Sequence, residues 1–536
     1  MTNTYTSNSS ESFIQSLKAV TADTAREFLL EHGYTASSFE IPEYYAPSKL
    51  DSINLRPIAW LDANGKKNEM PKITQPLEFL TPKGFLGWRS FSMLHPYIYI
   101  HVVNEMTEPS AWKTLQDILC TETLVSSYST PGFVVKEDEV TKKQAIDRWV
   151  LMAEKDLVKD CVGYSFLTVT DIKNFYPSIY THSISWAIEG KENIRNGNRQ
   201  NYTLLGNKLD KLFQNSRDGQ TNGIPVGSMV SDIIAEVILK RVDEILSEWI
   251  EEEDLEDSVL LTRYRDDYRI LSKAEEDGRM VLKELGRILN SEYNLTLNEE
   301  KTKIFSDILE GTIRDWSSEI NEDFLLRQVK YEEMDDTVTF YYLNDILLKI
   351  YKIQKKYPNG RPSVTLLSKL ITHLDSEDVT FELDESGVHT LVSILRKLSL
   401  VREEVSAQVF MLLDILFGKL SDEIKNSLIE EILETIRDSK DYDYQIVWLY
   451  RLCLAHNPDT CKTIDTDSSQ LLQVLTDDYV NGTKTDIEIF PEIDGLDASD
   501  TTELKKFSLV SHGILADSPN KAIDKESLRS FSYRHK

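Results

Sequence analysis

From Leu260 to Leu271 the sequence reads LLTRYRDDYRIL, in which two strand-like runs enclose a polar centre. This pattern predicts a tight β-hairpin with Asp266 and Asp267 at its tip. Aspartate is common in turns for backbone reasons alone. Two adjacent carboxylates repel each other, however, and burial would raise their pKa values. Carboxylate oxygens suit Mg²⁺, which removes both penalties, so the tip is a candidate site for phosphoryl transfer.

A second acid is expected to reach the same place from a different part of the chain. The short β-branched run from Phe166 predicts a strand that ends at Asp171. A two-metal polymerase needs carboxylates from separate segments that converge on metals roughly 3.5–4 Å apart. Asp171 and the hairpin tip are the two sources that this sequence offers.

Composition and charge limit the class of protein. The 536 residues, 41% hydrophobic and 10% aromatic, are typical of a globular chain with roughly two to four domains. No apolar run is long enough to span a bilayer, and the polar N-terminus lacks the features of a signal peptide. Four scattered cysteines without a CxxC pair favour reduced thiols. We therefore expect a cytoplasmic protein with no membrane partner.

The net charge of −29 bears on nucleic-acid binding. A protein that holds long duplexes usually has a basic surface. This chain leaves three possibilities: nucleic acid lies in a local basic channel, the bound strand is short, or nucleic acid is not the partner.

Four segments together resemble the motifs of reverse transcriptases, in the same order. Asp171–Ile179 resembles motif A and Gly223–Ser228 resembles motif B. Tyr264–Asp267 matches the YxDD of motif C, and Leu295–Lys303 is similar to motif D. Four ordered motifs are a far more specific signal than one acidic turn. The resemblance covers roughly Phe85 to Phe305.

Within that family the chain looks most similar to the bacterial abortive-infection reverse transcriptases of the AbiK type. Tyr180–Lys191 and the helical C-terminal half carry this likeness. The resemblance implies a role in antiphage defence. It also implies DNA synthesis that in some members needs no template and starts from a protein primer, and assembly into a homo-oligomer, a trimer or a hexamer.

The resemblance also implies roles for the acidic residues. Asp171 and Asp266 would be the main ligands of Mg²⁺ or Mn²⁺, with Asp267 in support. Lys301 would contact the leaving pyrophosphate or donate a proton. The alternative for Lys301 is a solvated surface lysine.

Further residues would bind the dNTP substrates. Tyr176 would lie under the incoming sugar and exclude a 2′-hydroxyl; its alternative role is a packed core aromatic. Gly223, Pro225 and Gly227 would shape the loop that approaches the nucleotide. Arg89, in a fingers-like segment, would hold the triphosphate, since its planar fork suits phosphate.

Two departures from the family pattern suggest unusual template and primer use. Val226 stands where templated enzymes often have Gln, and Arg265 fills a slot that is usually small or apolar. Arg265 could meet a primer phosphate or pair with nearby acids. Tyr44, Tyr45 and Tyr533 are candidate priming hydroxyls.

After about Gly311 the pattern changes: the strand signals fade after Thr337–Leu343, and helix follows helix. We therefore predict an α+β protein with right-hand-like reverse transcriptase fingers and palm over residues 1–310. An all-α HEAT-like helical repeat domain with a polar C-terminal tail would follow over residues 311–536. The expected helices are Asn344–Lys356, Ser363–Leu374, Val388–Leu400, Ser406–Leu420, Glu423–Arg437, Tyr444–Ala455 and Ser469–Tyr479.

The leading hypothesis is a metal-dependent DNA polymerase of the reverse transcriptase family, a DNA nucleotidyltransferase. Its partners would be deoxynucleotides, a single-stranded DNA product and, in a templated reaction, RNA. A templated RNA-directed DNA polymerase of a retron or intron-like element is one alternative. A catalytically idle polymerase-fold scaffold is the other, although the retained carboxylates speak against it.

Overall fold

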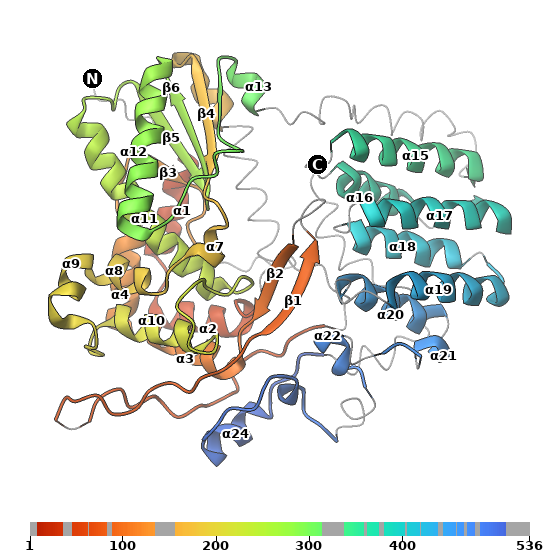
Figure 1. The fold of residues 1–536 in the computed structure, drawn as a ribbon, viewed down its shortest axis with the longest axis horizontal. Helices are drawn as coiled ribbons and strands as arrows, with labels where there is room; N and C mark the ends of the chain where they lie inside the picture. Colours follow the sequence, from red (N-terminus) through yellow and green to blue (C-terminus); the bar gives the residue numbers. More distant parts are fainter. Residues whose placement is uncertain are drawn as a thin grey trace.

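The computed structural model shows a part built on a five-stranded sheet and, beside it, a stack of helices (Figure 1). Helices outnumber strands throughout the described residues, so the expected mixture of α and β structure is present in a mostly helical form. No described helix is both long and apolar enough to cross a membrane. The structure describes residues 8–35, 45–62, 64–82, 88–133, 156–312, 337–357, 362–374, 380–401, 405–418, 420–437, 443–456, 458–461, 463–465, 469–476 and 483–510.

The central sheet has the strand order β3-β5-β6-β4-β7. β3 runs parallel to β5, and the other neighbours are antiparallel. The predicted strand and the predicted hairpin are confirmed as β4 and as β5–β6, respectively. The strands are β3 (Val125–Ser127), β4 (Phe166–Asp171), β5 (Val259–Tyr264), β6 (Asp267–Ser272) and β7 (Lys303–Phe305).

The two faces of this sheet differ. Helices α11 (Met229–Glu252) and α12 (Glu275–Tyr293) pack on the face that carries Tyr268. On the other face Leu167 and Leu271 form a small apolar cluster with α6 (Leu157–Asp160) and α13 (Ile308–Thr312). Because side chains alternate along a strand, Asp171 lies on the same face as Leu167, and Asp267 on the same face as Leu271. The two acids therefore share the face on which, among the described helices, α6 and α13 pack.

The remaining helices of this part pack around α11 or against the N-terminal segment. α7 is a short helix that begins after Asn174, whose φ is 46°. The helices are α1 (Asn8–Lys18), α2 (Ala22–His32), α3 (Pro96–Met106), α4 (Pro109–Leu119), α7 (Phe175–Ser178), α8 (His182–Glu189), α9 (Lys191–Asn193) and α10 (Leu205–Asn215).

A two-stranded hairpin lies between the sheet and the helical stack (Figure 1). Its strands are β1 (Leu77–Pro82) and β2 (Trp88–Met93), in antiparallel register. β1 contacts α20 (Asp443–His456) and α22 (Gln470–Gln473) of the stack. Among the described residues, this hairpin therefore provides a contact between the N-terminal part and the helices that follow.

The predicted helices from Asn344 to Ala455 are confirmed, with shifted ends. Of the last predicted helix, over 469–479, the described residues 469–476 contain only α22. Thr476 donates its hydroxyl to the Gln473 carbonyl, and such local bonds compete with helix continuation. The stack contains α15 (Phe340–Lys356), α16 (Pro362–Leu374), α17 (Glu385–Val401), α18 (Ser406–Phe417), α19 (Asp422–Arg437), α20 and α21 (Pro458–Cys461).

Residues 483–510 pack against the N-terminal half of the chain. Phe507 lies 5.7 Å from Tyr34 between ring centroids, and Arg56 pairs with Asp497 at 2.8 Å. The buried Asp486 carboxylate accepts the backbone N–H groups of residues 509 and 510 at 2.8 and 3.0 Å. The polar segment that follows the helical stack therefore includes an ordered strap. The division of the chain near residue 310 stays a prediction.

His95 links this strap to α3 and should make stability depend on pH. Its Nδ1 accepts the Tyr97 N–H at 3.1 Å, and its ring packs 5.0 Å from Phe490. Burial lowers the pKa of His95 to about 3. The unfolded chain takes up this proton near pH 6.5 while the folded chain does not, so stability falls as the pH drops from about 6.5 towards 3.

We expect His95→Asn, which keeps a cap acceptor but cannot titrate, to lose stability less steeply between pH 7 and 5. Across the full range the titration of His95 would remove at most about 5 kcal/mol of stability. The measurement is the chemical denaturation midpoint at each pH. His32→Asn is the control, since the His32 side chain is 37% exposed. An identical slope in wild type and His95→Asn would contradict the assignment.

Candidate active site

The strand register brings the three predicted acids to one edge of the sheet. In the β4–β6 pairing Asp171 lies opposite Asp267, and in the β5–β6 pairing Tyr264 also lies opposite Asp267. Arg265 and Asp266 therefore form the two-residue connection, and Arg265 has a left-handed φ of 52°. The Ile172 N–H donates to the Asp266 carbonyl at 3.2 Å, which ties the end of β4 to this turn.

The acids repel each other and are partly removed from water. Burial raises the pKa of Asp266, and the Asp171 charge adds to this. Burial, followed by the Asp266 charge, raises the pKa of Asp267 to about 6. Lys301 forms an ion pair with Oδ2 of Asp171. Lys301, Arg265 and Arg269 oppose these shifts, yet the pKa values of Asp266 and Asp267 stay raised, so a further cation beside them would stabilise their charged forms.

The donor chemistry fits a divalent cation, but the side chains as they stand do not enclose one. Oδ1 of Asp171 is buried without a hydrogen-bond partner in the described part of the chain. Hard cations such as Mg²⁺ and Mn²⁺ prefer carboxylate oxygens of this kind. Within the described ranges, no three acidic, His or Cys side chains converge closely enough to hold an ion. Lys301 occupies the other Asp171 oxygen, so it must turn away before a cation is bound there.

The motif D segment is fastened to β4 by backbone bonds. The Asn298 N–H donates to the Asp171 carbonyl at 2.8 Å, and the Lys173 N–H donates to the Thr296 carbonyl at 2.8 Å. The hydroxyls of Thr170 and Thr302 lie 2.7 Å apart. Lys301 is thereby placed beside Asp171, although the Lys301 side chain remains 59% exposed.

The motif B loop is docked on α7. The Gly223 N–H donates to the Ile179 carbonyl at 2.8 Å, and the Ile224 N–H donates to the Tyr176 carbonyl at 3.0 Å. Gly223, Pro225 and Gly227 are all buried. The loop thus approaches Tyr176 through its backbone, while its approach to a nucleotide stays a prediction.

The same loop also contacts the β1–β2 hairpin, where Arg89 lies. The Ser92 N–H donates to the Val226 carbonyl at 2.8 Å. Arg89 is in β2, opposite Thr81, and its side chain is outside the described part of the structure. The backbone therefore brings the fingers-like strand to the motif B loop, while the proposed phosphate contact of Arg89 stays a prediction.

Tyr176 makes a contact that the sequence did not indicate. Its ring is half-buried, and its hydroxyl donates to Oδ1 of Asp232 at 2.6 Å. Arg265 donates to the other oxygen of Asp232 at 2.8 Å. Of the two roles considered for Arg265, pairing with a nearby acid is the one observed. Asp232 lies in the first turn of α11 and belongs to none of the recognised motifs.

The candidate priming tyrosines differ in position. The Tyr45 side chain is 6% exposed, and its hydroxyl donates to the Leu471 carbonyl at 2.6 Å. A hydroxyl enclosed in this way cannot meet a nucleotide, so the structure argues against Tyr45 as a primer. Tyr44 and Tyr533 lie outside the described residues.

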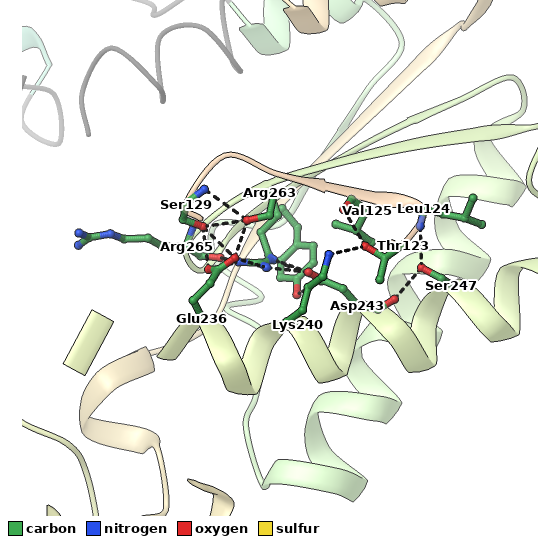
Figure 2. A network of polar contacts seen from close by, with 12 residues as sticks. Thr123, Leu124, Val125, Ser129, Glu236, Lys240, Asp243, Ser247, Arg263 and Arg265 are labelled. Atoms are coloured by element: carbon green, nitrogen blue, oxygen red, sulfur yellow. Dashed lines mark hydrogen bonds and ion pairs between the residues drawn. The ribbon is translucent and has the colours of Figure 1, made fainter. Parts of the chain in front are cut away.

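Beneath the hairpin tip, a buried charge cluster joins β5 to α11 (Figure 2). Arg263 is fully buried between two acids of α11. Its Nη1 and Nη2 each lie 2.9 Å from the Glu236 carboxylate, and Nη2 lies 2.6 Å from Asp243. The Tyr268 hydroxyl donates to Asp243 at 3.0 Å, and Lys240 donates to Thr123 at 3.0 Å. Two cations therefore balance two anions in this cluster.

The pKa shifts show how strongly Arg263 holds the acids. Burial alone would raise the pKa of Glu236, but Arg263 and two serine hydroxyls lower it to about 2. Burial dominates at Asp243 and raises its pKa despite the same arginine. The cluster also reaches the turn: the Ser129 hydroxyl accepts the Arg265 N–H at 2.8 Å, and the Arg265 carbonyl accepts from Arg263 at 3.2 Å.

The family model described as reverse transcriptase (RNA-dependent DNA polymerase) matches residues 111–350. This span is less than half of the chain but contains motifs A to D and the whole central sheet. Residues 111–350 are therefore similar to a reverse transcriptase domain, and this similarity supports the expected enzyme class of DNA nucleotidyltransferase. No curated protein matches the sequence.

The solved structures that match this chain include telomerases, at low identity and low TM-score. The apo telomerase from Candida tropicalis truncated from its C-terminal domain is 17% identical over 44% of this chain and 50% of that chain, with a TM-score of 0.27. Apo telomerase from Candida tropicalis is 12% identical over 72% and 69%, with a TM-score of 0.32. Telomerase from Candida albicans with a fragment of telomeric RNA is 13% identical over 78% and 67%, with a TM-score of 0.26. The chain thus spans half the length of the first of these, and TM-scores this low carry no conclusion about function.

Gly223 should be intolerant of a side chain for two separate reasons. Its φ is 79°, and an added Cβ would lie 2.6 Å from Nη1 of Arg217 and 3.0 Å from the Pro177 carbonyl. We expect Gly223→Ala to destabilise the fold by about 1–3 kcal/mol, measured as a shift in denaturation midpoint. Gly219→Ala is the matched control, because Gly219 has a similar φ of 76° but open space around its Cα. Equal losses in both variants would show that contact with the motif A segment is irrelevant.

Arg263→Met should be among the most damaging single changes in this domain. It leaves Glu236 and Asp243 buried without their cation, which typically costs about 3–5 kcal/mol. Arg263→Lys keeps the charge but loses the fork, so an intermediate loss is expected. Arg279→Met is the control, because the exposed Arg279–Glu275 pair should contribute only about 0–1 kcal/mol. Similar denaturation midpoints for Arg263→Met and Arg279→Met would refute the role of the cluster.

Proposed function

We propose that this chain is a metal-dependent DNA polymerase of the reverse transcriptase type that acts in antiphage defence by abortive infection. The observation that carries the proposal is the β4–β6 register, which puts Asp171 beside Asp267 next to the turn that holds Asp266. The reverse transcriptase domain supports the class of reaction. The defence role rests on the resemblance of Tyr180–Lys191 and the helical half to the AbiK-type enzymes.

The reaction is the transfer of a nucleotidyl group to a hydroxyl. The attacking oxygen forms a bond to the α-phosphorus of a dNTP while the bond to pyrophosphate breaks. Mg²⁺ or Mn²⁺ held by Asp171 and Asp266, with Asp267 in support, would lower the pKa of the attacking hydroxyl and stabilise the leaving oxygen. Lys301, once released from Asp171, is placed to contact pyrophosphate or to donate a proton to it.

In this proposal the motif B loop and the Tyr176 ring select the nucleotide. Tyr176 would lie under the sugar and exclude a 2′-hydroxyl. Gly223, Pro225 and Gly227 would let the loop backbone approach the nucleotide. Arg89 would hold the triphosphate from the β2 strand.

Template and primer use are proposed to be unusual. Val226 replaces the amide side chain that templated enzymes often carry, and the net charge of −29 disfavours a long duplex. We therefore propose synthesis of single-stranded DNA without a template from a protein hydroxyl. Tyr44 and Tyr533 remain as candidates for this hydroxyl once Tyr45 is set aside.

The helical stack is proposed to be a HEAT-like repeat that supports assembly. Stacked helices of this kind offer broad surfaces for protein partners. In this proposal the chain forms a trimer or a hexamer in the cytoplasm.

The polymerase proposal is tested with purified protein, labelled dNTPs and Mg²⁺ or Mn²⁺, without added nucleic acid. We expect DNA product from the wild type and at least about a 100-fold loss in Asp266→Ala, because charge stabilisation at the α-phosphate is removed. Asp257→Ala is the control: it removes an exposed acid at the opposite end of the same hairpin. Label that stays with the protein through denaturation would support a protein primer.

Other outcomes identify the alternatives. Product that forms only with added RNA, and copies its sequence, would favour a templated enzyme of a retron or intron-like element. Absence of product together with full phage protection by Asp266→Ala in cells would favour a scaffold. Loss of phage protection in Asp266→Ala alone, with Asp257→Ala protective, is the result that the proposal expects.

A further inference from the structure

A single carboxylate outside the predicted metal ligands joins three parts of the site. Asp232, in the first turn of α11, accepts the Tyr176 hydroxyl on Oδ1 at 2.6 Å and Nη2 of Arg265 on Oδ2 at 2.8 Å. Tyr176 comes from α7, and Arg265 comes from the turn between β5 and β6. These partners are distant in sequence, so Asp232 fixes the spacing of three independent segments.

Tyr176 meets Asp232 as a protonated phenol, and Arg265 meets it from a fixed backbone. Burial, followed by the Asp232 charge, raises the pKa of Tyr176 well above its usual value, so the phenol remains a proton donor. Arg265 approaches from a fixed backbone, because its N–H donates to Ser129 and its carbonyl accepts from Arg263. Figure 2 shows the Arg265 side chain extending away from the buried cluster while its backbone stays within it.

An ordinary surface ion pair does not account for this arrangement. The Arg265 and Asp232 side chains are 38% and 30% exposed, and pairs with such exposure add little to stability. The Tyr176 hydroxyl makes the difference, because the orientation of a half-buried ring then depends on the pair. Removing Asp232 should therefore change the position of Tyr176 more than it changes the stability of the fold.

We propose that Asp232 is a positioning residue that holds the Tyr176 ring for discrimination between deoxyribonucleotides and ribonucleotides, and that Arg265 keeps Asp232 in that orientation. The inference rests on the proposed polymerase function. A ring held by its hydroxyl cannot turn aside for a 2′-hydroxyl, whereas an unheld ring can. Nucleotide selection would thus be linked to the hairpin that carries Asp266.

The test is the ratio of kcat/KM for dATP to kcat/KM for ATP. Asp232→Ala should lower this ratio about 2- to 10-fold, the range that corresponds to one net hydrogen bond. Asp232→Asn keeps an oxygen for Tyr176 but loses the charge that pairs with Arg265, so it should lower the ratio less. Arg265→Ala removes the same ion pair and should lower the ratio by a similar amount. Tyr176→Phe should resemble Asp232→Ala, and the double variant should show no further loss.

Glu244→Gln is the matched control, since it also replaces a carboxylate of α11 that pairs with an arginine, here Arg241 at 2.6 Å. It lies about 18 Å along the helix from Asp232. An unchanged ratio in Asp232→Ala, or equal losses for both nucleotides, would overturn the inference. If the wild type makes no DNA, the polymerase proposal fails by itself. The role of Asp232 is then tested by binding alone, with dATP and ATP competing against a fluorescent nucleotide. The same ratio of dATP affinity to ATP affinity in wild type and Asp232→Ala would reject this role.

Discussion

The placement of the candidate site depends on one buried arginine. Arg263 has no exposed surface and sits between Glu236 and Asp243 of α11. A buried charge is strongly unfavourable unless it is paired and hydrogen-bonded, and here all three groups of the guanidinium have acceptors. Arg263 is separated from the β5–β6 turn only by Tyr264. Helix α11 therefore binds the hairpin close to the turn that carries Asp266.

The importance of this cluster lies more in register than in stability. Replacing a buried ion cluster by apolar groups is often neutral for stability, but the cluster satisfies its charges in only one arrangement. A slip of one residue in β6 would move Asp267 to the opposite face of the sheet. The same slip would disturb Tyr268, whose hydroxyl donates to Asp243. The pairing of Asp171 with Asp267 is thus specified by contacts on the opposite face of the sheet.

The sequence predicted local features well and distant contacts poorly. The strand ending at Asp171, the hairpin and most helices were predicted because each has its own periodicity over a few residues. Arg263 was not singled out, since an arginine beside a polar turn resembles a solvated side chain. Tyr45 was kept as a candidate primer because the sequence does not show that its hydroxyl is bonded to Leu471, more than four hundred residues away. Interactions of this kind leave no short-range pattern.

A weak signal for the missed residues does exist in α11. Asp232, Glu236 and Asp243 are spaced by four and seven residues, which places them on one face of a helix whose neighbouring positions are apolar. An acidic stripe on a buried face requires cations, and Arg263 and Arg265 on either side of Tyr264 supply them. Arg263 points into the cluster, whereas the left-handed φ of Arg265 accompanies a side chain directed towards Asp232. One helix face thus fixes the hairpin and, through Asp232, the ring of Tyr176.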